Sequence, residues 1–521
     1  MPKMPIKSSP SPTSERLRFS TAILRLLGEE LNPSPDQGIL ELIKNSYDAD
    51  ATQCSVELKG VHIKGGAIKL VDNGIGMAAA EIRNGWLIVG DSLKSRSEKS
   101  PSGRLLVGSK GLGRLGALRL GRKVKMITRP KSEPGIQYRV EIDWSAFDHV
   151  KVVEDVELAV EREKVPAGAS HGTEILISQL PTPWRESDIK RLARAILLLR
   201  DPFAKDQSFQ ATLKAEEFAE LEQLAHEGYF SECDFHLIAK IDQRGRASAE
   251  VQGAGGKRIF VGKHDDIADD KNAKSYRIPP LTFELWEFNL SNKGFAIASN
   301  KAKLTELKTW LAQFGGVRLY HRKIRVMPYG EQKNDWLDMN LRRSQYQELR
   351  PSTNNSVGCV RIEDPNGVFQ QKTDRLGFIE GDALEELRKF ADNALAWMSG
   401  EREKERRKKL QAEAERARQN KGAAETEMAA VIESLPAGEK QKVKNAAAKV
   451  QAAHEAEVKI KDETAQLYFT LGTVGTTAAA FAHQTKQPIR GIVADAKTLD
   501  EYLGNPDELM LYRDDKAISQ C

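Results

Sequence analysis

The sequence predicts an α+β fold that ends in long helices, and three observations lead to this prediction. Apolar residues recur at the spacing of a helix face at Leu40, Ile43 and Tyr47. Segments 54–59 and 67–71 are predicted to be strands, the second being the apolar run AIKLV. After Phe390 the composition changes to Ala, Glu, Lys and Arg, with almost no Gly or Pro before Pro436, which is typical of long helices.

Composition and charge are ordinary for a chain of two to four domains. The 521 residues include 40% hydrophobic and 29% charged residues, with a formal net charge of +5. This small excess of positive charge does not by itself indicate nucleic-acid binding. The four cysteines show no metal-binding spacing, so we expect reduced thiols in a cytoplasmic protein. We find no signal peptide or membrane anchor in the sequence.

The predicted helix at 41–51, ELIKNSYDADA, carries the first candidate site. Glu41, Asn45 and Asp48 share one helix face, at i, i+4 and i+7. A carboxylate one turn before an amide suits a nucleotide site, because the amide oxygen can coordinate Mg²⁺ and the acid can take a proton from water. On this segment alone, a solvated helix face is an equally good interpretation.

Three further motifs follow in order. VDNGIGM puts Asp72 at the end of a strand and Gly74 and Gly76 in the loop after it. GSKGLGRLGALRLG, at 108–121, is a glycine-rich loop that opens into a helix, and its backbone N–H groups suit phosphates. His171-Gly172-Thr173 then precedes the strand EILIS. One glycine-rich loop is weak evidence, but four motifs in this order are strong evidence for a nucleotide site.

The four motifs resemble those of the GHKL ATPases, which include gyrase-type topoisomerases, heat-shock chaperones, sensor histidine kinases and MutL proteins. The resemblance covers roughly residues 18–180 and is greatest to bacterial MORC-like members. It implies an N-terminal Bergerat α/β sandwich that binds ATP and Mg²⁺.

The resemblance also implies a role for each motif residue. Glu41 is similar to the general base that activates water, and Asn45 to the Mg²⁺ ligand. Asp72 would accept the adenine amino group, with Gly74 and Gly76 letting the backbone approach the base. Lys110, Gly111 and Gly113 would cap the phosphates, and the Thr173 hydroxyl would form a hydrogen bond near the adenine. The complete set of other residues expected at the nucleotide is Met77, Lys110, Gly111, Leu112, Gly113 and Thr173. Phosphotransferring histidine kinases commonly lack the acid that Glu41 supplies, so Glu41 favours hydrolysis.

Two segments outside the motifs are expected to move or contact the nucleotide. The polar segment 91–104 suits a lid over the nucleotide, with an ordinary surface loop as the alternative. Apolar pairs bracket a basic turn at 320–323, which predicts a hairpin with cations at its tip. By resemblance to MORC-like members this is a transducer element, with Lys323, Arg322 or Arg325 contacting the γ-phosphate. A solvent-exposed hairpin is the alternative.

The C-terminal part combines long helices with a second motif. Helices on either side of Pro436 predict a helical hairpin or coiled coil. The segment FAHQTKQPI resembles the phospho-acceptor box of sensor histidine kinases, with His483 and Pro488 at the expected spacing, although Gln484 replaces the usual acid. Too little chain follows for that kinase's own ATP-binding domain. Three interpretations of this segment therefore stay open: His483 is a phospho-acceptor, the segment is a helical dimerisation element, or the chain is a truncation of a longer protein.

We therefore expect five segments and an ATP-driven function. The segments are a disordered region or arm at 1–17, a GHKL ATP-binding domain at 18–185, a transducer-like α/β domain at 186–395, a helical hairpin or coiled coil at 396–466 and a histidine-kinase-like dimerisation segment at 467–521. The expected function is Mg²⁺-dependent ATP hydrolysis by an ATP-gated homodimeric clamp, with DNA or a protein as client and no membrane. The alternatives are a signalling protein phosphorylated at His483 and a non-hydrolysing, nucleotide-regulated scaffold or DNA clamp.

Overall fold

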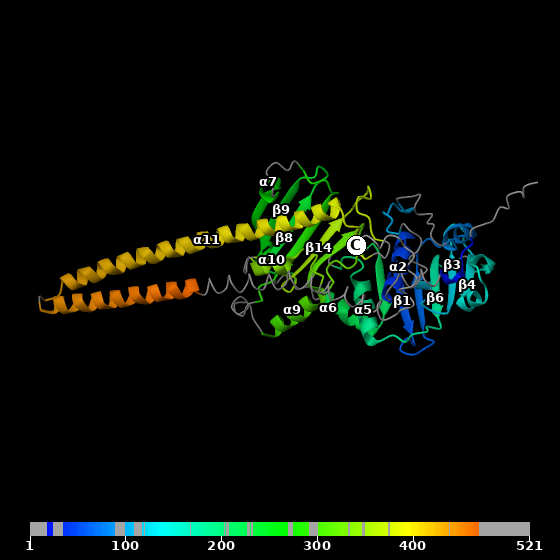
Figure 1. The fold of residues 1–521 in the computed structure, drawn as a ribbon, viewed down its shortest axis with the longest axis horizontal. Helices are drawn as coiled ribbons and strands as arrows, with labels where there is room; N and C mark the ends of the chain where they lie inside the picture. The colour runs from blue at the N-terminus through cyan, green and yellow to red at the C-terminus, as the bar shows by residue number, and fades with distance from the viewer. Residues whose placement is uncertain are drawn as a thin grey trace, which may run out of the picture. The chain divides into compact units, whose positions relative to one another are not determined.

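The computed structural model describes most of the chain and divides it into two units. The described residues are 18–23, 35–88, 99–108, 117–118, 120–166, 168–202, 204, 208–226, 230, 233–268, 275–290, 301–331, 334–345, 350–372, 376–436 and 438–467. One unit comprises Met1–Leu337 and Thr353–Ala394, and the other comprises Asp338–Ser352 and Leu395–Cys521. Two seven-stranded sheets with helices confirm the predicted α+β class (Figure 1).

The first sheet has the strand order β5-β4-β3-β6-β2-β1-β7. Its strands are β1 (Gln53–Lys59), β2 (Ala67–Asp72), β3 (Lys123–Arg129), β4 (Ile136–Asp143), β5 (Val160–Lys164), β6 (Gly172–Ser178) and β7 (Gln210–Lys214). All neighbours are antiparallel except β1 and β7, which are parallel. The expected strands at 54–59 and 67–71 are β1 and β2. The sheet also takes in β7, which lies beyond residue 185 in the sequence.

Helices cover this sheet and fix the position of the first candidate motif. They are α2 (Pro35–Asp48), α3 (Ala79–Glu81), η1 (Ile82–Trp86), η3 (Trp144–His149), η4 (Val153–Asp155), α5 (Glu186–Leu197) and α6 (Glu216–His226). Ile39 and Ile43 of α2 are fully buried in the same core as Ile68 of β2. Asp36, in the first turn of α2, is ion-paired to Arg191 of α5 at 2.8 Å, which ties the two helices together.

The second sheet has the strand order β10-β9-β8-β11-β14-β12-β13. Its strands are β8 (Phe235–Ile241), β9 (Ala247–Gly253), β10 (Arg258–Lys263), β11 (Leu281–Glu287), β12 (Gly316–His321), β13 (Ile324–Val326) and β14 (Ser356–Ile362). The shorter helices in this part of the chain are η6 (Ala254–Gly256), α7 (His264–Ile267) and α9 (Lys301–Phe314). β12 and β13 form the hairpin that the apolar pairs predict, with His321 opposite Ile324. Its turn is therefore Arg322-Lys323.

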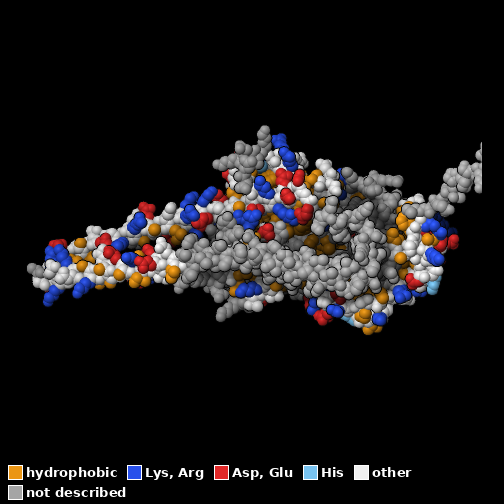
Figure 2. Space-filling view, in the orientation of Figure 1, with side chains coloured by type: hydrophobic (Ala, Val, Ile, Leu, Met, Phe, Trp, Pro, Cys, Tyr) orange, Lys and Arg blue, Asp and Glu red, His pale blue; other side chains and the backbone are white. Residues whose placement is uncertain are grey.

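The C-terminal part is helical. It contains α10 (Met339–Gln345), α11 (Asp382–Glu433) and a helix at 438–467. α11 and the last helix lie side by side and antiparallel (Figure 1), and Lys444 is ion-paired to Glu433 at 3.2 Å across the turn between them. Both signs of charge alternate along their surface (Figure 2), as in the ion pair of Arg407 with Glu403. None of the helices within the described ranges has the apolar length needed to cross a bilayer.

Candidate functional site

One cavity brings together candidate residues from four segments of the chain. Its volume is about 700 Å³, which is within the usual range for a small-molecule site. Asn45 of α2, Asp72 of β2, Gly76 and Met77 of the following loop, and Thr173 of β6 all line it. The strand order explains the convergence, because β2 lies between β1 and β6 and α2 packs over them. Motifs more than a hundred positions apart therefore share one wall.

Three hydrogen bonds fix the carboxyl group of Asp72 at the wall of this cavity. Its Oδ1 accepts hydrogen bonds from the backbone N–H of Gly74 at 2.8 Å and of Thr173 at 3.2 Å. Its Oδ2 accepts from Ser46 Oγ at 2.8 Å. Burial raises the pKa of Asp72 above its ordinary value, although these three hydrogen bonds act in the opposite direction. The carboxyl is thus held in one orientation at the cavity wall.

Two glycines allow the backbone around Asp72 to pack closely. Gly76 has φ of +67°, and a Cβ there would lie 2.1 Å from the carbonyl oxygen of Arg129. Gly172 has φ of +136°, and its Cβ would lie 2.1 Å from the carbonyl oxygen of Asp72. A larger residue at either position would force the neighbouring backbone to shift. Gly172 was not among the predicted site residues, although it directly precedes Thr173.

Ser46 and Thr128 are polar residues of the site that sequence reasoning missed. Thr128 is fully buried, accepts a hydrogen bond from the Met77 N–H at 2.9 Å, and lies 3.1 Å from Thr173 Oγ1. It therefore connects the loop after β2 to β6. Ser46 could have been identified from the sequence, because it directly follows Asn45 inside the helical motif. Thr128 lies in an ordinary strand pattern, KVKMITR, and only strand register reveals it.

Glu41 lies one turn before Asn45 on α2 and is 5% exposed. It is not among the residues that line the cavity with Asn45. Its Oε1 accepts a hydrogen bond from Lys44 Nζ at 2.9 Å, and Lys44 is itself 7% exposed. The carboxylate and the ammonium therefore form a largely buried ion pair. The predicted base is therefore held by a lysine that the sequence analysis did not single out.

The C-terminal end of α2 anchors the segment that leads into the glycine-rich loop. Asp48 accepts hydrogen bonds from the N–H groups of Val107 at 2.9 Å and Gly108 at 3.0 Å. Arg104 donates from Nη1 to the carbonyl oxygen of Ala51 at 2.6 Å. Asp50 accepts from Ser100 Oγ at 2.5 Å and also binds Ser102. Residues 100–104, the end of the expected lid, are thus bound to the segment that directly follows α2.

Several predicted site residues fall outside the described ranges. These are Lys110, Gly111, Leu112 and Gly113 of the glycine-rich loop, and His483 of the C-terminal motif.

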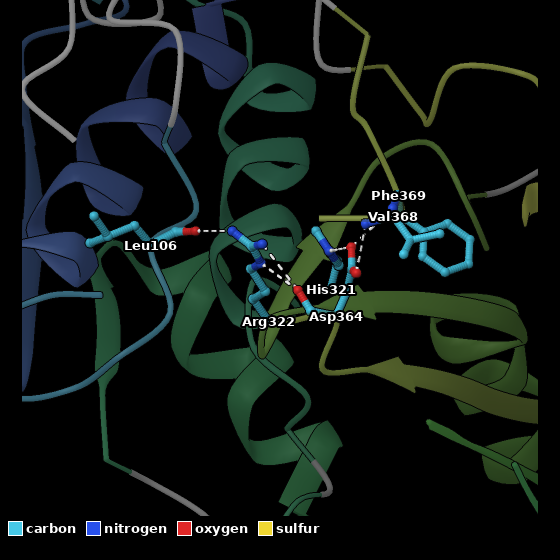
Figure 3. A network of polar contacts seen from close by, with 6 residues as sticks. All are labelled: Leu106, His321, Arg322, Asp364, Val368 and Phe369. Atoms are coloured by element: carbon cyan, nitrogen blue, oxygen red, sulfur yellow. Dashed lines mark hydrogen bonds and ion pairs between the residues drawn. The ribbon is translucent and has the colours of Figure 1, made fainter. Parts of the chain in front are cut away.

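The basic turn of the second sheet lines a different cavity. Its volume is about 460 Å³, and its lining includes Lys323, Arg322, Arg104 and Tyr47 but none of the residues that line the larger cavity. Arg322 donates from Nη1 to the carbonyl oxygen of Leu106 at 2.9 Å (Figure 3). Arg325 is 2% exposed and ion-paired to Glu331 at 2.8 Å, so it lies inside β13 and not at the tip.

One family match agrees with the motif analysis. Residues 34–173 match the family described as "Histidine kinase-, DNA gyrase B-, and HSP90-like ATPase". The "Putative type II restriction enzyme HgiDII" of Herpetosiphon aurantiacus is 34% identical over 103 residues, which are 20% of this chain and 16% of that protein. A solved structure, "Crystal Structure of N terminal domain of a DNA repair protein", is 11% identical and covers 74% of this chain and 98% of its own, with a TM-score of 0.40. The family match confirms the GHKL resemblance of this segment, and the MORC-like assignment stays a prediction.

Proposed function

We propose that this chain, whose residues 34–173 match the GHKL-type ATPases, binds ATP in the 700 Å³ cavity and hydrolyses it. The observation that carries the proposal is the convergence of Asn45, Asp72 and Thr173 on that cavity. Their side chains come from three separate elements, and each is of the type that the resemblance requires at its position. Turnover would be slow if closure of the site precedes chemistry.

Asp72 has the hydrogen-bonding capacity to recognise adenine. An ionised carboxylate offers about four acceptor positions, and Gly74, Ser46 and Thr173 occupy three of them. The remaining position suits the exocyclic amino group of adenine. Guanine carries a carbonyl oxygen at the equivalent place, which a carboxylate would repel. The site should therefore prefer ATP to GTP.

Asn45 and Glu41 of α2 carry the oxygen atoms needed for a magnesium ion and for an attacking water. Mg²⁺ prefers oxygen ligands, and the amide oxygen of Asn45 at the cavity wall is such a ligand. When bound, the ion would neutralise charge on the phosphates. Glu41, one turn away, would take a proton from water, and Lys44 would keep its carboxylate in place.

We further propose that ATP closes the protein into a homodimeric clamp, with Lys323 approaching the γ-phosphate in the closed state. DNA is the first client to test, because the matched curated protein is named as a type II restriction enzyme. Light scattering with and without ATP would show dimerisation. DNA-stimulated phosphate release would show the client, and its absence would direct the search to a protein partner.

The central experiment follows γ-labelled ATP with Mg²⁺. Glu41→Gln should lose phosphate release and keep nucleotide binding, whereas Asp72→Asn should lose binding. Glu141→Gln is the matched control, because Glu141 is an exposed acid of β4 outside the cavity. Phosphate release from Glu41→Gln at the wild-type rate would refute the assignment. Label retained on the protein and lost in His483→Ala would instead identify the signalling alternative.

A further inference from the structure

The turn between β12 and β13 has an unusual backbone. Arg322 has φ of 52° and Lys323 has φ of 68°, so both adopt the left-handed conformation. Two-residue hairpin turns of this kind favour Gly and Asn, because other side chains crowd the backbone there. A long cationic residue at the first position costs free energy that some contact must offset.

The contacts of Arg322 show what this side chain does. Its Nη1 donates to the carbonyl oxygen of Leu106 at 2.9 Å, while Nη2 and Nε donate to the carbonyl oxygen of Asp364 at 3.0 and 3.3 Å (Figure 3). One guanidinium thus joins two backbone segments. Its planar fork of donors suits this task, and the single ammonium of lysine does not.

Asp364 is a rigid support for this arginine. It is fully buried, and its carboxylate accepts hydrogen bonds from His321 Nε2 at 2.9 Å, Val368 N–H at 2.8 Å and Phe369 N–H at 2.9 Å. Figure 3 shows Arg322 between Leu106 on one side and this network around Asp364 on the other. Asp364 lies two residues after β14 ends, so the guanidinium links the segment next to the second sheet to Leu106.

Leu106 lies at the junction of the nucleotide cavity and the glycine-rich motif. It lines the cavity together with Asp72 and Thr173. The next two residues, Val107 and Gly108, donate their N–H groups to Asp48. The hydrogen bond from Arg322 therefore joins the β12–β13 turn to the cavity wall, although the two residues are 216 positions apart in sequence.

We propose that Arg322 is a positioning residue that couples the nucleotide cavity to the second sheet through the Leu106 carbonyl. This rests on the proposed function, because the signal is nucleotide binding. Arg322 acts here through backbone carbonyl groups, and contact with the γ-phosphate is not part of this role. Nucleotide that orders the wall at Leu106 also orders the β12–β13 hairpin.

Hydrogen exchange measured by mass spectrometry tests this coupling. With a non-hydrolysable ATP analogue and Mg²⁺, the wild type should show slower exchange at Asp72–Met77 and at 316–326. In Arg322→Gly, nucleotide should still slow exchange at Asp72–Met77. The slowing at 316–326 should be several-fold smaller than in the wild type. Glycine suits the positive φ of the turn, so this variant removes the side chain without straining the hairpin. Arg322→Lys keeps the charge and should not restore the coupling.

Arg244→Gly is the matched control, because Arg244 is an exposed arginine in the β8–β9 turn of the same sheet. Its exchange pattern should equal that of the wild type. Nucleotide-induced protection of 316–326 that persists in Arg322→Gly would overturn the coupling. The coupling would also be overturned if nucleotide protected Asp72–Met77 but not 316–326 in the wild type. No protection at Asp72–Met77 would overturn the proposed function itself, and with it the coupling.

Discussion

Replacing Glu41 by alanine should destabilise the protein as well as remove the proposed catalytic base. Glu41 and Lys44 side chains are 7% and 9% exposed and lie 2.9 Å apart. Within the described residues, Glu41 is the partner of the Lys44 ammonium. Glu41→Ala would leave that ammonium buried and uncompensated. Breaking a buried pair in this way typically costs about 3–5 kcal/mol.

A double-mutant cycle isolates this effect. The variants are Glu41→Ala, Lys44→Met and the double variant, and the measurement is the free energy of unfolding in urea. Glu41→Ala leaves the buried Lys44 ammonium without the carboxylate that it contacts, whereas the double variant removes both charges. The double variant should therefore be more stable than the sum of the two single losses indicates, by roughly the cost of one unpaired charge, about 3 kcal/mol.

The result that would refute this reasoning is additivity. If the two single losses add in the double variant, the groups do not interact in solution. Glu41→Gln is the matched control, because its amide oxygen still accepts a hydrogen bond from Lys44 and its volume is unchanged. It should unfold at a urea concentration closer to the wild type than Glu41→Ala does.

Two further predictions concern the loop after β2 and the buried network of the second sheet. Gly76→Ala should abolish binding of a fluorescent ATP analogue, because the new Cβ would lie 2.1 Å from the Arg129 carbonyl oxygen. Gly65→Ala, at an open position of positive φ outside the cavity, is the control, and equal loss in both would contradict the steric argument. Burial lowers the pKa of His321 below its ordinary value, against the effect of Asp364. The unfolded chain then takes up the proton first, so stability should fall as pH drops below about 6.5, and a His321→Asn variant that keeps the same pH dependence would contradict this.

Several residues that line the cavity lie in motifs that are readable in the sequence. Asn45, Asp72, Gly76 and Thr173 lie in short patterns whose chemistry is readable without a structure, and all four line one cavity. Thr128 could not be predicted, because its role depends on the register that places it opposite Thr173 across β3 and β6. Register follows from packing of whole strands and not from any single motif.

Two lysines show the same limit in a different way. Lys44 has the sequence context of a solvated helix residue, and only the packing of α2 shows that it is buried beside Glu41. The basic turn at Lys323 was predicted from its flanking apolar pairs, and β12 and β13 form that hairpin. Arg104 and Tyr47 line the same cavity as Lys323 but lie far from it in sequence, so no motif predicts that they come together.

The parallel pairing of β7 with β1 determines where the chain can be cut for laboratory work. β7 covers the edge of the first sheet and is contributed by residues 210–214, after α5. A fragment ending at residue 185 would expose the backbone N–H and C=O groups of β1, and unpaired edges of this kind associate with one another. An expression fragment that contains the first sheet should therefore extend at least through α6, which ends at His226.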